Sequence, residues 1–248
     1  MTAAAAKRAL VIVPTYNERE NLPVLVAQLM QQANVSLLVV DDQSPDGTGA
    51  IADALAKEYP GRIEVMHRTG ARGLGRSYID GMQTLLARPV DVDVICQMDA
   101  DLSHDPRHLP ALIAATDRAD IVIGSRYVPG GEIVNWPKRR RMLSRFANSY
   151  IRLVTRLRAR DCTSGYRCWR REALASIQLR NFTSEGYSFL VEMLYAAAAA
   201  RLRFAEVPIT FVERRLGESK LSKAVLIESA ITPWRLVASS KPPARPAS

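Results

Sequence analysis

Short β-type runs alternate with helix-type segments over the first half of the chain, and this alternation restricts the fold more than any other feature. The runs are mostly apolar and are expected as strands at residues 9–13, 36–40, 63–66, 92–98 and 120–124. Segments with helical periodicity lie between them. Strands that alternate with helices in this way are typical of βαβ units. The sequence therefore predicts an α/β fold with a mostly parallel, Rossmann-like sheet flanked by helices.

Polar residues follow three of the predicted strands directly. Pro14 to Glu18 come after the first strand, Asp41 to Asp46 after the second, and Asp99 to His104 after the strand at 92–98. The carboxyl ends of parallel strands meet at one edge of a sheet, and open α/β sheets bind ligands there. We therefore expect the three clusters to converge on one cleft.

Two carboxylates, Asp99 and Asp101, are separated by a single residue at the end of an apolar strand. Once the chain turns out of the strand, both can reach one hard cation. Mg²⁺ or Mn²⁺ held in this way keeps positions open for substrate phosphates. The alternative is a polar turn in which Ser103 or Asp105 caps a helix that begins near Pro106.

The positive charge of the chain is concentrated in one block. Between Lys138 and Arg171 there are twelve Lys and Arg residues and one acid, Asp161, in a chain of net charge +9. Such a block favours nucleic acid, lipid headgroups or a phosphorylated substrate as the partner, with a solvated basic face as the alternative. Nucleic acid is not expected, because the sequence contains no helix-turn-helix, zinc or RNP pattern and only 6% aromatic residues.

Within the basic block, residues 139–157 are predicted to form an amphipathic helix. Leu143 and Phe146 belong to its apolar side, and Arg145 and Arg152 to the opposite side. The helix either lies on an anionic membrane surface or packs its apolar side on the sheet. No apolar run approaches the roughly 18–20 residues that span a bilayer.

The size of the chain and its cysteines suggest one domain in a reducing compartment. The chain has 248 residues, and its three cysteines, Cys96, Cys162 and Cys168, suit neither a disulfide framework nor a zinc site. One domain is expected over residues 1–240, followed by a disordered Pro-rich tail at 241–248. The first eight residues lack the apolar core of a secretory signal, so a cytoplasmic location is expected.

Taken in order, the motifs resemble the family 2 glycosyltransferases with the GT-A fold. The segments that carry this likeness are Pro14 to Glu18, Asp41 to Thr48 and Asp99 to His104. A narrower set resembles the dolichyl- and polyprenyl-phosphate mannose synthases, namely Ser125 to Tyr127, Arg140 to Ser144, Thr163 to Arg167, Glu185 to Tyr187 and Gly217 to Leu221. The likeness extends over about residues 9–225. Within that family the chain resembles the type without C-terminal transmembrane helices.

This resemblance implies transfer of mannose, with inversion, from GDP-mannose to a polyprenyl monophosphate, with Mg²⁺ or Mn²⁺ as the cofactor. It assigns the nucleotide sugar to Pro14, Tyr16, Glu18, Val40, Asp42, Asp99, Ala100, Asp101 and Arg126. It assigns the metal to Asp99 and Asp101, with Ser103 or a water as the third ligand, and makes Asp101 the catalytic residue. It assigns the phosphates of donor or acceptor to Arg140, Ser144, Arg167, Arg171, Arg214, Ser219 and Lys220.

The chemistry of that reaction agrees with the residue types present. A phosphate monoester is already anionic near neutral pH, so it needs positioning by arginine more than a general base. His104, beside Asp105 and Pro106, is therefore expected to help cap the following helix and not to catalyse. We expect the protein at the cytoplasmic face of the membrane, on the membrane surface or on a membrane-protein partner. A UDP-sugar-dependent prenyl-phosphate transferase and a basic nucleotide- or nucleic-acid-binding module without catalysis are the alternatives.

Overall fold

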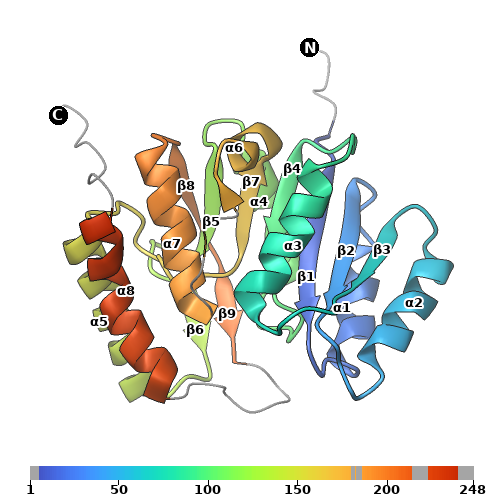
Figure 1. The fold of residues 1–248 in the computed structure, drawn as a ribbon, viewed down its shortest axis with the longest axis horizontal. Helices are drawn as coiled ribbons and strands as arrows, with labels where there is room; N and C mark the ends of the chain where they lie inside the picture. Colours follow the sequence, from blue (N-terminus) through green and yellow to red (C-terminus); the bar gives the residue numbers. More distant parts are fainter. Residues whose placement is uncertain (1–5, 180–181, 183–185, 214–222, 240–248) are drawn as a thin grey trace.

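A seven-stranded sheet forms the centre of the molecule, with a separate two-stranded sheet beside it (Figure 1). The computed structural model describes residues 6–179, 182, 186–213 and 223–239. The strands are β1 (Ala9–Thr15), β2 (Val35–Asp41), β3 (Ile63–His67), β4 (Val94–Gln97), β5 (Ile121–Ser125), β6 (Glu132–Val134), β7 (Arg167–Arg170), β8 (Phe204–Pro208) and β9 (Thr210–Val212). The helices are α1 (Asn21–Leu29), α2 (Thr48–Glu58), α3 (Leu74–Leu86), α4 (Leu109–Ala115), α5 (Lys138–Thr155), α6 (Arg171–Ala175), α7 (Gly186–Ala199) and α8 (Lys223–Ser239), with a 3₁₀ turn η1 (Pro106–His108).

The strand order in the large sheet is β3-β2-β1-β4-β7-β5-β8. All neighbouring strands are parallel except at β7, which runs antiparallel to both β4 and β5. The predicted α/β fold with a mostly parallel sheet flanked by helices is therefore confirmed. The small sheet pairs β6 with β9 in parallel. It brings two segments that are distant in the sequence to the edge where β1 and β2 end.

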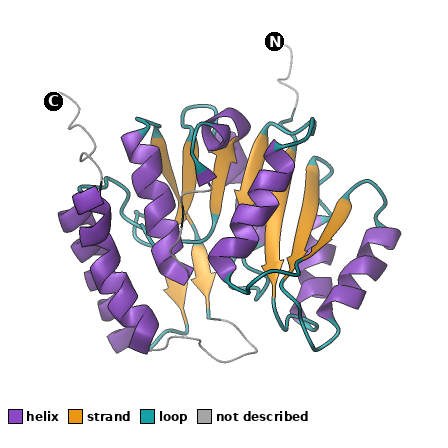
Figure 2. Ribbon diagram, in the orientation of Figure 1, coloured by secondary structure: helices purple, strands orange, loops and turns teal. Residues whose placement is uncertain are grey.

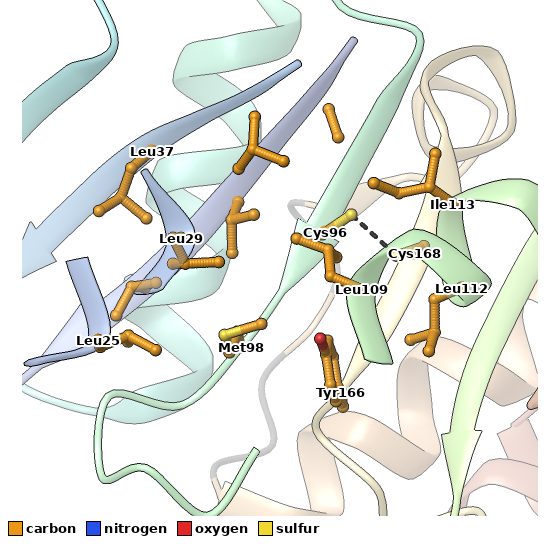
Figure 3. Packing of buried hydrophobic residues seen from close by; sticks show 14 of the residues in the cluster. Leu25, Leu29, Leu37, Cys96, Met98, Leu109, Leu112, Ile113, Tyr166 and Cys168 are labelled. Carbon is orange, nitrogen blue, oxygen red and sulfur yellow. Dashed lines mark hydrogen bonds between the residues drawn. The ribbon is translucent and has the colours of Figure 1, made fainter. Parts of the chain in front are cut away.

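Helices cover both faces of the large sheet, and each face has its own apolar core (Figure 2). Because side chains alternate along a strand, Val11 and Val13 of β1 enter one core while Leu10 and Ile12 enter the other. The first core is closed by α1, α2 and α4, and Figure 3 shows its centre. The second core is closed by α3, α6 and α7, with contributions from α5 and α8. Burial on both faces explains why the strands are almost continuously apolar.

The cysteines are buried and free. Cys96 on β4 lies directly opposite Cys168 on β7, and their sulfur atoms are 2.8 Å apart (Figure 3). Burial raises the pKa of Cys162 to about 12. The thiol is therefore the stable form of Cys162 at neutral pH.

Residues 204–212 form two short strands that belong to different sheets. Pro208 ends β8, and β9 begins two residues later as part of the small sheet. Proline cannot donate to a strand ladder, so it is tolerated at the edge position that β8 occupies. The predicted tail at 241–248 lies outside the described residues. No helix in the described part of the chain is long and apolar enough to cross a membrane.

His67 ends β3 and links it to α2. Its Nε2 lies 2.9 Å from Asp53 Oδ1, and this hydrogen bond raises the pKa of His67 above its ordinary value of 6.5. A raised pKa means that the protonated form stabilises the fold below pH 6.5 and that this stabilisation is lost as the pH rises through the folded-state pKa. We therefore expect a His67→Ala variant to lose more unfolding free energy at about pH 6 than at about pH 8.5, as measured by urea denaturation. Equal losses at the two pH values would contradict this linkage.

Candidate active site

A cleft of about 530 Å³ opens where β1, β2, β4 and β5 end. Most of the residues predicted to bind the nucleotide sugar, together with two further predicted ligands, line this one cleft: Pro14, Tyr16, Glu18, Asp42, Asp99, Ala100, Asp101, Ser103, Arg126 and Arg140. The predicted convergence of the strand-end clusters is therefore observed.

Asp101 is held by the turn that follows β4. Its Oδ1 accepts hydrogen bonds from the Ser103 backbone N–H at 3.1 Å and from Ser103 Oγ at 2.5 Å. Leu102, between them, has a φ of 62°, a left-handed conformation that is uncommon for a leucine. The Ser103 hydroxyl thus orients the Asp101 carboxylate, and its role as a third metal ligand stays a prediction.

Asp99 is positioned from the opposite side of the turn. Its Oδ1 accepts a hydrogen bond from the Tyr78 hydroxyl at 3.2 Å, and its backbone N–H donates to His104 Nδ1 at 3.2 Å. Burial, reinforced by the charge of Asp99, raises the pKa of Tyr78 well above 10, so the hydroxyl stays a donor. His104 is itself buried and stacks on Tyr166 with ring centroids 5.1 Å apart. It supports the turn through Asp99, whereas the cap of η1 that was predicted for it is made by Asp105.

The donor set at this turn fits a hard divalent cation. Asp99 and Asp101 supply two carboxylates to the cleft wall, and Mg²⁺ is commonly bound by one or two carboxylates plus substrate phosphates. Over the ranges that the structure describes, no group of three or more His, Cys, Asp or Glu side chains is arranged to hold a metal. Two carboxylates leave the remaining positions around such an ion to substrate phosphates and water.

Arg126, directly after β5, forms a buried ion pair with Asp161. Its Nε and Nη2 each donate to the Asp161 carboxylate at 2.7 Å, and its backbone N–H donates at 3.0 Å. Burial opposes ionisation of Asp161, but Arg126 outweighs this effect and the pKa of Asp161 lies below its ordinary value of 3.8. The rings of Trp136 and Phe211 lie 5.7 Å and 5.3 Å from the guanidinium. The charge and aromatic contacts fix the direction in which Arg126 enters the cleft.

Arg140, in the first turn of α5, enters the same side of the cleft. Its guanidinium lies 4.0 Å from the centre of the Trp136 ring, and its Nη1 donates to Glu213. Ser144, one turn further along α5, accepts a hydrogen bond from the Tyr127 hydroxyl at 2.7 Å and is not part of the cleft wall. Its predicted phosphate contact stays a prediction.

The predicted phosphate contacts of Arg167 and Arg171 are wrong. Arg167 is fully buried, and its three guanidinium nitrogens donate to the backbone carbonyls of Ser164, Cys162 and Leu190. Arg171 begins α6 at the other end of β4, where its backbone N–H bonds to the Asp93 carbonyl and its side chain to the Leu85 and Arg88 carbonyls. Both arginines tie loops and helices together.

The remaining predicted residues lie in the sheet or outside the described part of the chain. Val40 is buried in β2 beside Pro14, and its side chain belongs to the second core. Arg214, Ser219 and Lys220 lie outside the described residues, and their roles stay predictions.

Several residues of the cleft wall could not be predicted from the sequence, including Tyr78, Arg72, Trp136 and Phe211. None of these residues directly follows a strand of the large sheet, so the expectation that ligands bind at strand ends does not predict them. Asp161 was noticed only as the single acid of the basic block. That isolation was the available signal that it has a specific partner.

Sequence comparison finds relatives of this chain among the glycosyltransferases. Residues 10–178 match the family model described as glycosyl transferase family 2. A polyprenol monophosphomannose synthase from Mycolicibacterium smegmatis is 48% identical over 230 residues, which cover 92% of this chain and 86% of the relative. An undecaprenyl-phosphate mannosyltransferase from Micrococcus luteus is also 48% identical, over 93% of this chain and 95% of the relative.

Solved structures share the fold at low identity. A mannosyltransferase from Pyrobaculum calidifontis, in complex with GDP-Man and Mn²⁺, aligns with 94% of this chain and 74% of its own, with a TM-score of 0.56 and 17% identity. Residues 1–349 of TarS from S. aureus, in complex with UDP, align with 94% of this chain and 66% of their own, with a TM-score of 0.61 and 17% identity. The matched family model covers more than half of the chain, so this protein belongs to glycosyl transferase family 2.

Proposed function

We propose that this protein transfers mannose, with inversion, from GDP-mannose to a polyprenyl monophosphate. The observation that carries the proposal is the arrangement of the cleft. Asp99 and Asp101 lie between a side lined by Tyr16 and Asp42 and a side lined by Arg126 and Arg140. Two relatives that are 48% identical, one named a polyprenol monophosphomannose synthase and the other an undecaprenyl-phosphate mannosyltransferase, support the same reaction.

The donor occupies the side formed by the ends of β1 and β2. Tyr16, Glu18 and Asp42 contact the nucleoside, and the diphosphate extends toward Asp99 and Asp101. These two carboxylates hold the divalent ion, Mg²⁺ or Mn²⁺, which neutralises charge on the leaving diphosphate. Negative charge that develops as the sugar bond breaks is stabilised by groups fixed in advance, which in a water-poor site is worth several kcal/mol.

The acceptor phosphate occupies the side lined by Arg126 and Arg140. An arginine fork binds two phosphate oxygens and directs the third toward the sugar. Because the phosphate is already anionic, the attacking oxygen needs no proton acceptor. This explains why His104 is free to support the turn.

The prenyl chain of such an acceptor remains in the bilayer, so we place the protein at the cytoplasmic face of the membrane. The docking face that we propose consists of the exposed apolar residues Met142, Phe146 and Leu153 on α5 and Ile231 and Trp234 on α8. Their exposed fractions are 72%, 70%, 81%, 57% and 59%. The inward side of α5 is mostly polar, with Asn148, Ile151 and Thr155 buried, so the predicted apolar side packs on the sheet only in part.

Charge and position support this docking face. Between Lys138 and Thr155, α5 carries six Lys or Arg residues and no acid, and each basic residue near an anionic surface contributes about 1 kcal/mol. The two helices lie side by side at one end of the molecule (Figure 1), joined by a hydrogen bond from the Tyr150 hydroxyl to the Ala230 carbonyl at 2.7 Å. Arg140 on α5 and Glu228 on α8 both reach the cleft. Docking therefore brings the cleft to the lipid surface.

A double variant, Phe146→Ser with Leu153→Ser, is expected to lose binding to vesicles that contain phosphatidylglycerol, because burial of two large apolar side chains is lost. Charge reversal at Arg145 and Arg152 is expected to weaken binding about tenfold or more. Cosedimentation measures both effects. Val24→Ser on α1, also exposed at 45%, is the matched control and should bind like the wild type. Binding that is unchanged in both variants would rule out this face.

Transfer of label from GDP-[¹⁴C]mannose into organic-extractable lipid tests the reaction itself. Purified protein, a polyprenyl phosphate in detergent and Mg²⁺ are expected to give labelled lipid, and EDTA is expected to abolish it, because the diphosphate is held through the ion. UDP-[¹⁴C]glucose serves as the matched donor and is expected to give no product. Label from the UDP-sugar alone would replace the proposed donor, and label that resists EDTA would remove the metal from the proposal.

A further inference from the structure

The loop between β3 and α3 is fixed against the end of β2. Arg68 Nη1 donates to Asp42 Oδ1, and the Gly73 backbone N–H donates to Asp42 Oδ2 at 2.8 Å. Arg68 Nη2 also donates to the Ala71 carbonyl at 3.0 Å, and Arg68 Nε donates to Asp80 at 2.7 Å. One buried carboxylate thus holds both ends of the loop. These hydrogen bonds are made entirely within the protein and fix the loop against the end of β2.

The loop presents Arg72 over Tyr16. The Arg72 guanidinium carbon lies 4.8 Å from the centre of the Tyr16 ring, and its Nη1 donates to the Tyr16 hydroxyl. Both residues line the cleft. The other arginines of the cleft wall, Arg126 and Arg140, lie on the far side of Asp99 and Asp101, beyond β4 in the strand order. The proposed donor places its phosphates at the two carboxylates, so Arg72 lies where the base belongs.

We infer that Arg72 reads the base of the donor and selects guanine. This inference rests on the proposed guanine-nucleotide donor. A guanidinium fork matches the O6 and N7 acceptors of guanine, whereas the corresponding edge of uracil offers only O4. Guanine therefore receives two hydrogen bonds from Arg72 and uracil one. Asp42 also supports this contact through the loop, because its carboxylate accepts hydrogen bonds from Arg68 and from the Gly73 backbone N–H on either side of Arg72.

A contact with the diphosphate is the competing role for an arginine in this cleft, and the two roles predict different binding. An arginine on the phosphates contributes equally to GDP and UDP, because the two ligands share the diphosphate. An arginine on the base contributes more to GDP than to UDP, because guanine offers it two acceptors and uracil one. The probes are GDP, UDP and 7-deaza-GDP, which lacks the N7 acceptor, and their affinities are measured by calorimetry with Mg²⁺ present.

For the wild type we expect GDP to bind more tightly than UDP, and about tenfold more tightly than 7-deaza-GDP because one charge-assisted hydrogen bond is lost. Arg72→Ala is expected to weaken GDP binding about 10- to 100-fold, to weaken UDP binding by a clearly smaller factor because only one hydrogen bond is lost, and to abolish the discrimination against 7-deaza-GDP. Arg72→Lys keeps the charge but not the fork, and should resemble Arg72→Ala. Arg76→Ala, an exposed arginine of the same segment outside the cleft wall, is the control and should bind all three ligands like the wild type.

Two results would overturn the inference while leaving the proposed donor intact. Equal losses for GDP and UDP in Arg72→Ala would assign the residue to the phosphates, and unchanged GDP affinity would assign it no role in binding. A wild-type protein that prefers UDP would instead overturn the proposed donor, and the inference with it. Because Arg72 is exposed, its replacement leaves the apolar cores unchanged, and a thermal melt checks that each variant is folded.

Discussion

Replacing Asp101 with asparagine is expected to lower the rate of mannosyl transfer about 100- to 1,000-fold while leaving the protein folded. Asparagine has the same shape and can still accept the hydrogen bond from the Ser103 backbone N–H. What it lacks is the negative charge that holds a divalent ion beside the diphosphate. The measurement is kcat at saturating GDP-mannose and Mg²⁺, with circular dichroism as the test of folding.

Asp105→Asn is the matched control for this prediction. It makes the same chemical change four residues further along, at a carboxylate that caps η1 by accepting from the Arg107 backbone N–H at 2.9 Å and does not line the cleft. The Asp105→Asn protein is expected to be somewhat less stable than the wild type and to have the same kcat. If the two variants turned over at equal rates, Asp101 would have no special role in the chemistry.

Removal of the Asp161 carboxylate is expected to have the largest effect on stability. In Asp161→Ala, the guanidinium of Arg126 would remain buried without its counter-ion, and breaking a buried pair in this way costs about 3–5 kcal/mol. Both side chains are at most 5% exposed, so water cannot replace the lost contact. Urea denaturation measures the free energy of unfolding, and the slope m checks that the unfolded state is unchanged.

A second substitution separates the ion pair from the packing around it. Arg126→Met combined with Asp161→Ala leaves no unpaired charge, so the double variant is expected to be more stable than Asp161→Ala alone. The double variant should nevertheless be inactive, because Arg126 is lost from the cleft. If the free energy of unfolding of Asp161→Ala were within about 1 kcal/mol of the wild-type value, the Arg126–Asp161 pair would contribute no more than an exposed salt bridge.

Much of the site could be predicted because ligands of open α/β sheets bind at the carboxyl ends of the strands. That rule depends only on the direction of the chain. Polar residues after β1, β2 and β4 must emerge at one edge of a parallel sheet, and Tyr16, Asp42 and Asp101 do share a cleft. The family resemblance added Arg126 and Arg140, which no periodicity places. The pattern of a single segment is therefore not enough to assign these two residues to the site.

Residues whose role depends on long-range partners could not be predicted in this way. Arg167 looks like a phosphate ligand by type, but it lies in the short strand β7, and burial turns its guanidinium toward carbonyl groups. Periodicity showed that α5 is amphipathic but not which side faces inward. Its inward side is selected by the surroundings of Asn148, whose Oδ1 accepts from the Cys162 backbone N–H at 2.7 Å and whose Nδ2 donates to Thr163.

The position of β7 has a consequence for synthesis on the ribosome. β4 and β5 flank β7 in the finished sheet, yet Cys96 and its partner Cys168 are separated by 72 residues. At about 5–20 residues per second, that stretch takes about 4 to 14 s to translate. During this interval β4 lacks its neighbour, and from the time β5 has been made two apolar strands present open edges that can pair with other chains. The nascent chain is therefore most vulnerable to aggregation after β5 has emerged and before β7 inserts, and this is the window in which a chaperone would have most effect on yield.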